Sequence, residues 1–331
     1  MELPFFTLDV FTDRVFGGNP LGVFPDAAHL PSDLMQKLAR EMAYSETVFL
    51  GPPETPEGTV RVRIFTPGKE VPFAGHPTVG TAVFVASAEY AGIGGSPAAS
   101  GAASGRDPAP AGGAGRDAPS GPDASRTVFL EENVGLVPVE VHVRDGVPVS
   151  GTLTAAVAPE IRPSPVSADV LARVVGLEPS DLLRDELRPE MVSCGLPFFV
   201  VPVRSLDQAW RARLDPSLWE KHVAPLWADH VYVVAMEGES PDVDVHVRMF
   251  APAVGVPEDP ATGSAAAALG AYLAAADGRA DGSLRWVVEQ GLEIDRPSRL
   301  VVEADRTGGE TTAVRVGGDA VLVSRGTLSL P

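Results

Sequence analysis

The chain carries one sequence segment twice, about 185 residues apart, and this repeat limits the folds that it can adopt. Residues 60–67 read VRVRIFTP and residues 245–252 read VHVRMFAP. Each copy runs through a Val-Pro pair to a glycine, Gly75 or Gly263, and then enters an apolar, alanine-containing stretch. Alternation is typical of a strand, and a continuous apolar stretch of this length is typical of a buried helix. Two distant copies indicate two similar domains rather than a solenoid.

A helix that is apolar on all sides must be surrounded by other elements. The first such helix is predicted over residues 78–88, and the second contains the longest apolar run, residues 265–276. Strand-like runs are frequent in both halves, so a curled sheet around each helix is the natural cover. We therefore expect an α+β fold with an N-terminal domain over residues 1–158 and a C-terminal domain over residues 159–331.

Local patterns add further expectations. Residues 32–42 predict a helix with Ser32 as its N-cap. Asp145-Gly146 between two apolar runs predicts a hairpin turn, and residues 159–165 are predicted to be a linker. Residues 91–125 contain almost only Gly, Ala, Ser, Pro, Asp and Arg. Such a segment buries too little apolar surface to offset its ordering entropy, so we predict a disordered surface insertion, with a binding arm as the alternative.

Composition excludes several classes of partner. The net charge is −18 and no cluster of Lys or Arg stands out, which disfavours nucleic acid and anionic membranes. Cys194 is the single cysteine, so no internal disulfide can form and a reducing compartment is expected. The N-terminus lacks the pattern of a signal peptide, and the longest apolar run is too short to cross a bilayer. These features predict a cytoplasmic protein.

The sequence offers no motif for a metal or a nucleotide cofactor. Its six histidines show no metal-ligand spacing, and the glycine-rich phosphate-binding motifs of nucleotide enzymes do not occur. We predict that the protein uses neither. Cys194 lies outside both copies of the repeat, so a buried structural cysteine is the preferred interpretation.

Both copies of the repeat end at a helix start made of small residues, Gly75-His76 in one and Gly263-Ser264 in the other. The N-terminus of a helix attracts anions through its free N–H groups and its dipole. If the two domains face each other, both starts converge on one cleft that suits a substrate carboxylate or a developing enolate. The alternative is two ordinary capped helix starts.

Three side chains near these segments are candidates for acid–base chemistry. Glu46 begins an apolar strand, where desolvation would raise its pKa toward that of a working general base; a solvent-facing glutamate is the alternative. Asp259 either caps the second helix or holds a catalytic group. His76 either donates a proton to the substrate or is a helix-start residue that bonds to the backbone.

Taken together, these segments resemble the PhzF-like phenazine-biosynthesis family, which is related in fold to diaminopimelate epimerase. The matching segments are GNPLGVF (18–24), SETVFL (45–50), RIFTP (63–67), EVPFAGHPT (70–78), RMFAP (248–252) and EDPATGSA (258–265). Shorter matches follow at 290–291, 296–298 and 316–318. The similarity covers nearly the whole chain except the insertion.

The resemblance implies two pseudo-symmetric domains, each a β-barrel wrapped around a central α-helix, with the active site between them. It also implies a homodimer. The implied catalytic residues are Glu46, which moves a proton between carbons, with His76, Asp259 and Ser264. The implied substrate contacts are Gly75, Gly263, Thr262 and Asn19. Related racemases place a cysteine at each helix start, which this chain does not, so a two-thiol mechanism is excluded.

The functional hypothesis is a cofactor-independent isomerase that moves a proton between carbons of a small anionic, carboxylate-bearing metabolite. Glu46 would remove and return the proton while the helix-start groups hold the anion. The alternative is a non-catalytic metabolite-binding or regulatory protein with the same cleft. A third reading, an interaction scaffold that acts through the insertion, rests on that segment's composition alone.

Overall fold

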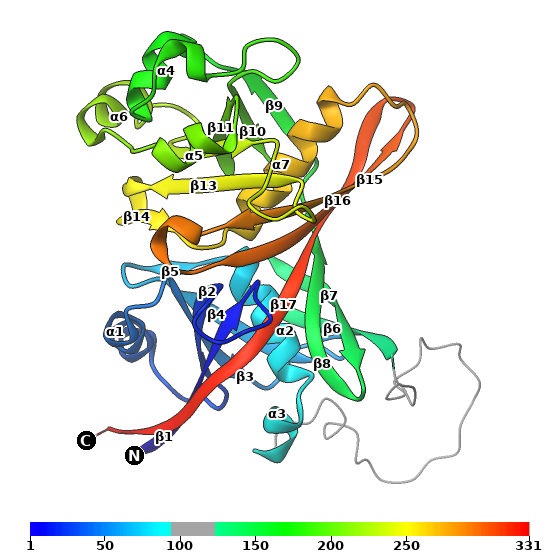
Figure 1. Cartoon of the computed structure of the whole chain (residues 1–331). Helices are drawn as coiled ribbons and strands as arrows, with labels where there is room; N and C mark the ends of the chain where they lie inside the picture. Colours follow the sequence, from blue (N-terminus) through cyan, green and yellow to red (C-terminus); the bar gives the residue numbers. More distant parts are fainter. Residues whose placement is uncertain (94–122, 331) are drawn as a thin grey trace.

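The computed structural model describes residues 1–93 and 123–330 (Figure 1). The insertion predicted over residues 91–125 lies mostly outside these described residues. Its two described edges belong to regular elements: residues 91 and 92 end the helix α3 (Ala88–Gly92), and residues 123–125 begin the strand β6 (Asp123–Glu132). The boundaries predicted for the insertion were therefore too wide.

The strands carry most of the described chain. They are β1 Glu2–Val10, β2 Asn19–Phe24, β3 Glu46–Gly51, β4 Val60–Phe65, β5 Glu70–Val71, β6 Asp123–Glu132, β7 Gly135–Arg144, β8 Val147–Thr154, β9 Glu160–Pro163, β10 Glu190–Ser193, β11 Pro197–Val203, β12 His230–Ala235, β13 Val245–Ala251, β14 Val256–Asp259, β15 Gly282–Gln290, β16 Ser298–Thr307 and β17 Glu310–Ser329. The helices are α1 Ser32–Met42, α2 Gly75–Val85, α3 Ala88–Gly92, α4 Ala168–Val174, α5 Leu206–Arg211, α6 Pro216–His222 and α7 Gly263–Ala276, with short 3₁₀ turns at Pro179–Asp181, Pro252–Val254 and Leu292–Ile294.

Hydrogen-bonded pairs connect these strands into one mixed sheet that runs through both halves of the molecule. In Figure 1 the strands β1–β8, coloured blue to green, lie below and β9–β16, coloured green to orange, lie above, and β17 crosses from one half to the other. β17 pairs first with β16, then with β8, and finally with β1, so the chain ends on the sheet where it began. Within residues 1–93 and 123–330, no helix is long and apolar enough to cross a bilayer.

The two copies of the sequence repeat have the same strand pairings. In the first copy, β3 pairs in parallel with β2 and antiparallel with β4, and β4 pairs antiparallel with β5 and in parallel with β6. In the second copy, β12 pairs in parallel with β11 and antiparallel with β13. β13 then pairs antiparallel with β14 and in parallel with β15. The strand, loop and helix order predicted from the repeat is therefore confirmed.

The two apolar helices are enclosed by strands, as their sequences predict. Every residue of α2 is buried, and α7 is buried over most of its length. α2 packs against β1, β2, β8 and β17, and α7 against β10, β11, β16 and β17. Side chains around both helices belong to one continuous core. A second core lies between the other face of β11–β13 and α4–α6, and a third lies under α1.

Other local expectations have mixed outcomes. The hairpin turn at Asp145-Gly146 is confirmed, with φ of 50° and 78°, values that favour Asp and Gly. The N-cap of α1 is Pro31 rather than Ser32, whose hydroxyl instead accepts a hydrogen bond from Arg63. The linker predicted over 159–165 is wrong because β9 pairs with β10. The first buried helix was predicted over residues 78–88, but it begins three residues earlier, at Gly75, and also ends three residues earlier, at Val85.

Close packing against α2 gives a stability prediction. A Cβ at Gly80 would lie 2.6 Å from Cγ2 of Val10 and 2.8 Å from Cδ2 of Leu21, both fully buried. Alanine gains about 1 kcal/mol of helix propensity over glycine, but overpacking of a core typically costs about 1–3 kcal/mol. We expect Gly80→Ala to lower the free energy of unfolding, measured by urea denaturation. Gly92→Ala, at the end of α3 with no atom of the described residues within 4 Å of the new Cβ, should leave it unchanged or raise it slightly. Equal stability of the two variants would contradict this account.

Candidate active site

The first turns of α2 and α7 meet. A Cβ on Gly75 would lie 3.1 Å from the backbone nitrogen of Ser264 and 3.2 Å from Cα of Gly263. The N-cap residues are Ala74 and Thr262, and neither caps its helix with a side chain. The predicted convergence of the two helix starts is therefore present, and ordinary side-chain capping is not. Uncapped N–H groups at a helix start attract anionic groups.

Glu46 lies at the start of β3, beside the first turn of α2. Its Oε2 lies 3.5 Å from Nδ1 of His76, and 18% of its side-chain surface is accessible. Burial, with a smaller contribution from the negative charge of Asp259, raises the pKa of Glu46 to about 8. The alternative of a solvent-facing glutamate is wrong. A carboxyl with this pKa is mostly protonated at neutral pH and can both accept and return a proton.

His76 is the second residue of α2 and is almost completely buried. Burial lowers the pKa of His76 to about 3, against the opposing effect of a hydrogen bond to the Pro20 backbone. The imidazole is therefore neutral at physiological pH, and its contact with Glu46 is not an ion pair there. Nε2 of His76 has no hydrogen-bond partner among the described residues.

Asp259 ends β14 and accepts hydrogen bonds from three other segments. Asn19 Nδ2 donates to Oδ1 at 3.1 Å, Ser45 Oγ donates to the same oxygen at 3.5 Å, and Thr262 Oγ1 donates to Oδ2 at 2.5 Å. Burial raises the pKa of Asp259 to about 6, although these three bonds favour the ionised form. The interpretation of Asp259 as a helix cap alone is wrong because the N-cap of α7 is Thr262.

Asn19 and Thr262, two of the predicted substrate contacts, use their side-chain donors on other groups of the protein, chiefly Asp259. Asn19 also donates to the carbonyl of Ala261 at 2.8 Å, so both hydrogens of its amide are used. The hydroxyl of Thr262 is used on Asp259 and accepts a bond from Gln290 Nε2 at 3.1 Å. Whether either residue also contacts substrate stays a prediction.

Ser264 is the second residue of α7, the place that His76 takes in α2. Its side chain is partly accessible, and its backbone nitrogen faces Gly75. The structure thus brings Glu46, His76, Asp259 and the two helix starts together, with Ser264 at the junction.

Two supporting residues were not singled out from the sequence. Ser45 precedes Glu46 and bonds to Asp259 across the two halves. Gln290 donates to the backbone oxygen of Asp259 at 2.7 Å and accepts from the backbone N–H of Thr262 at 3.3 Å. Both residues lie in segments that resemble the family, so the resemblance could have identified them as candidates. Their hydrogen-bond partners are distant in sequence and are seen only in the folded chain.

Cys194 is half-buried, and its thiol lies 3.6 Å from the carbonyl of Ala267. Burial raises the pKa of Cys194 to about 12. Because the thiolate is the reactive form of cysteine, this side chain is unsuited to act as a base or nucleophile.

A buried ionic cluster holds the strand that ends in Asp259. Glu258, the preceding residue, accepts two hydrogen bonds from Arg248, both at 2.8 Å. His246 lies beside this pair, with Nδ1 3.0 Å from Glu289 and Nε2 2.9 Å from Glu293. Burial by itself would lower the pKa of His246, but the bonds and charges of the two glutamates outweigh it and raise the pKa to about 9.

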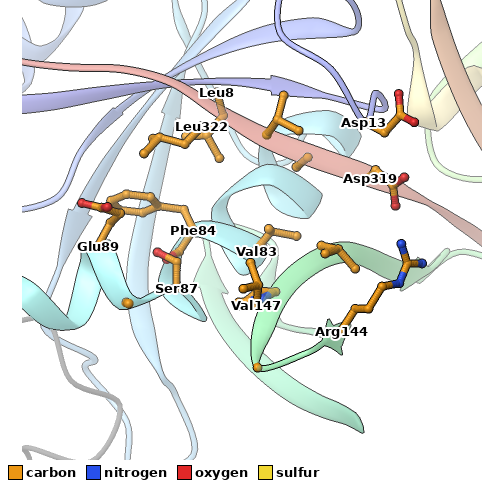
Figure 2. A pocket seen from close by; sticks show the side chains of 16 residues that line it. Leu8, Asp13, Val83, Phe84, Ser87, Glu89, Arg144, Val147, Asp319 and Leu322 are labelled. Atoms are coloured by element: carbon orange, nitrogen blue, oxygen red, sulfur yellow. The ribbon is translucent and has the colours of Figure 1, made fainter. Parts of the chain in front are cut away.

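A separate cavity of about 490 Å³ lies between the C-terminal end of α2, the β7–β8 hairpin and β17 (Figure 2). Its walls are mainly apolar and include Val83, Phe84, Val147 and Leu322. None of the residues predicted for catalysis lines it.

The proximity of the two carboxyl groups gives a prediction for their titration. We expect the side-chain carboxyl carbon of Glu46 to titrate with a midpoint near pH 8 in ¹³C NMR of glutamate-labelled protein. Asp259→Asn should lower this midpoint because it removes a negative charge that opposes ionisation of Glu46. Asp33→Asn, an exposed change on α1, should leave it unchanged. A wild-type midpoint near 4.5, the ordinary pKa of a glutamate, would contradict the assignment.

The histidine in the ionic cluster predicts how stability depends on pH. The pKa of His246 is about 9 in the folded chain, against the ordinary histidine value of 6.5 in the unfolded chain, so His246 stabilises the fold fully below pH 6.5. This contribution, at most about 3 kcal/mol, is lost as pH rises through 9. We expect the free energy of unfolding in urea to fall between pH 7 and 10. The fall should be smaller in His246→Gln but unchanged in His29→Gln, whose histidine is exposed. An identical fall in both variants would contradict this.

Comparison with known proteins gives consistent matches over the chain. The family model for phenazine biosynthesis-like proteins matches residues 8–95 and 118–326. An uncharacterized isomerase of Mesorhizobium japonicum is 38% identical over 325 residues, covering 97% of this chain and 96% of the relative. The trans-2,3-dihydro-3-hydroxyanthranilate isomerase of Pseudomonas aeruginosa is 33% identical and covers 96% of each chain.

The fold is similar to that of a solved family member. The crystal structure of a PhzF-family phenazine biosynthesis protein from Bacillus anthracis matches with a TM-score of 0.80 at 25% identity and covers 100% of both chains. The resemblance of the sequence to this family is therefore confirmed at the level of the fold.

Proposed function

The chain belongs to the family of phenazine biosynthesis-like proteins, and from this premise we propose that it is a cofactor-independent isomerase in which Glu46 moves a proton between two carbons of its substrate. The observation that carries the proposal is the raised pKa of Glu46, about 8, at a place where a neutral histidine and two helix starts meet. Relatives that are named isomerases support the reaction class.

The first step is removal of a proton by ionised Glu46. With a pKa of about 8, about a tenth of Glu46 is ionised at pH 7, and its basicity there is greater than that of an ordinary glutamate. The electron pair of the broken C–H bond remains on the substrate as a delocalised carbanion. The N–H groups at the starts of α2 and α7 can stabilise the oxygen that takes up this charge.

The second step returns the proton. Glu46, now protonated, donates to a different carbon of the same anion, so one carboxyl group performs both transfers and no other reactant is consumed. Asp259, with its lower pKa of about 6, is ionised at neutral pH and keeps Glu46 basic by its charge. Ser264 would hydrogen-bond the substrate at the junction of the two helices.

The residues at the helix starts argue against chemistry with two thiols. Gly75-His76 and Gly263-Ser264 occupy these starts, and the one cysteine of the chain, Cys194, has a raised pKa. A single carboxyl as the base is the mechanism that remains consistent with the groups present.

The proposed substrate is a small carboxylate-bearing metabolite. Two adjacent helix starts favour a carboxylate among their N–H groups. The relative from Pseudomonas aeruginosa isomerises trans-2,3-dihydro-3-hydroxyanthranilate, according to its name, and compounds of this class are the first candidates here. A phenazine pathway is one setting for such a reaction.

The architecture proposed for this reaction has two pseudo-symmetric halves, residues 1–158 and 159–331, each a β-barrel around one central helix. The repeated strand pairings and the enclosure of α2 and α7 support it. In this arrangement β17 would complete the N-terminal barrel through its pairing with β1. The homodimer implied by the family resemblance stays a prediction.

Hydrogen exchange with heavy water tests the proposed function. We expect the wild-type enzyme to incorporate deuterium from D₂O into trans-2,3-dihydro-3-hydroxyanthranilate, or another member of a panel of small carboxylates, as followed by NMR. Glu46→Gln should lower the rate by at least about 100-fold, because a positioned general base typically contributes that much. Glu41→Gln, the same change at an exposed position of α1, should leave the rate unchanged.

Two other outcomes would change the assignment. Equal exchange by wild type and Glu46→Gln would remove Glu46 from the mechanism. Binding of panel compounds with no exchange in any of them would favour the alternative of a non-catalytic metabolite-binding protein.

A further inference from the structure

Tyr232 lies on the same wall of the site as Asp259. Tyr232 of β12 is the direct partner of Met249 on β13, and Met249 is the direct partner of Asp259 on β14. Directly opposed residues on adjacent strands point to the same face of a sheet. Tyr232 and Met249 belong to the core that surrounds α7. Tyr232, Met249 and Asp259 therefore form a row on the face toward the start of α7.

The hydroxyl of Tyr232 has no hydrogen-bond partner in the part of the chain that the structure describes, although its side chain is completely buried. The ring packs against Phe198, with ring centroids 6.4 Å apart. A buried polar group without a partner typically costs about 1–3 kcal/mol, and native proteins retain few such groups. The chain offers a contrast in Tyr272 of α7, whose buried hydroxyl donates to the carbonyl of Arg188 at 2.8 Å.

The Tyr232 hydroxyl remains available as a donor. Burial, with an added contribution from the charge of Asp259, raises the pKa of Tyr232 far above physiological pH, so the phenol stays protonated. Replacing it with an ordinary apolar ring would remove the unpaired group with little change in volume. A buried donor left in this state points to a partner outside the chain.

Other buried polar atoms around Asp259 and Glu46 also lack a hydrogen-bond partner within residues 1–93 and 123–330. Nε2 of His76, whose Nδ1 faces Glu46, is one, and Oδ1 of Asn19, whose amide nitrogen bonds Asp259, is another. With the Tyr232 hydroxyl, they come from α2, β2 and β12 and gather around one pair of carboxyl groups. A polar ligand in the site would satisfy such groups.

We propose that the hydroxyl of Tyr232 donates a hydrogen bond to an oxygen of the bound substrate, from the wall that also carries Asp259. This inference rests on the proposed function and adds a specificity-determining contact to it. A site built to hydrogen-bond a ligand oxygen rejects analogues that lack it, because the buried donor is then left unpaired. The preferred ligand is therefore a carboxylate that carries an oxygen within reach of Tyr232.

Removal of this one hydroxyl tests the proposal, with Tyr272→Phe as the matched control. Binding is measured by calorimetry on the full chain for two ligands. One is 3-hydroxyanthranilate, the aromatic analogue of the substrate named for the Pseudomonas relative, and the other is anthranilate, which lacks only the ring hydroxyl. Stability is measured by thermal unfolding. We expect Tyr232→Phe to weaken binding of 3-hydroxyanthranilate about tenfold, the effect of one lost hydrogen bond. Its melting temperature should be unchanged or higher, because no internal bond is lost. Tyr272→Phe should show the opposite pattern, a lower melting temperature and unchanged binding.

The two ligands identify the oxygen. Equal weakening of both by Tyr232→Phe would place the carboxylate at Tyr232, and weakening of 3-hydroxyanthranilate alone would place the ring hydroxyl there; both results support the contact. Unchanged affinity for both ligands, or a melting temperature that falls as much as in Tyr272→Phe, would overturn it. Failure of the proposed function would give a different result: the wild type would show no deuterium exchange that depends on Glu46. In that case the melting temperatures of Tyr232→Phe and Tyr272→Phe would still test whether the Tyr232 hydroxyl is unpaired inside the protein.

Discussion

The contact between the first turns of α2 and α7 is the constraint on which the candidate site depends. Gly75 faces the Ser264 nitrogen and Gly263 so closely that a side chain at Gly75 would crowd the start of α7. Strands enclose both helices, and one core surrounds them, so the helices cannot separate without opening that core. The packing therefore fixes two sets of free N–H groups side by side, and the segments that reach this junction bring the acid–base groups with them.

Burial at this junction gives two similar carboxyl groups different tasks. Glu46 has few internal partners, so desolvation dominates and its pKa rises to about 8. Asp259 is even further removed from water, but three donors favour its charge and hold its pKa at about 6. At neutral pH one is mostly protonated and the other mostly ionised. Separate pKa values for neighbouring titratable groups are typical of acid–base sites.

The two halves use the same local scaffold with different side chains. An arginine of β4 or β13 forms a paired bond with a glutamate just before each helix start, Arg63 with Glu70 and Arg248 with Glu258. The first pair is partly exposed, whereas the second is buried beside His246. One half contributes Glu46 and His76 and the other contributes Asp259 and Ser264, an arrangement that suits a reaction with a single base.

The sequence by itself determined the repeated strand, loop and buried helix, because side-chain periodicity and apolar character are local properties of the chain. It also marked Glu46, His76, Asp259 and Ser264 through their motifs. Only the tertiary structure decided how these groups are partnered. Asn19 and Asp259 are 240 residues apart in sequence yet share a hydrogen bond, and Ser45 reaches the same carboxylate. The early start of α2 and the orphaned hydroxyl of Tyr232 likewise follow from packing against distant strands. Burial and long-range hydrogen bonds set each pKa, and no local pattern encodes them.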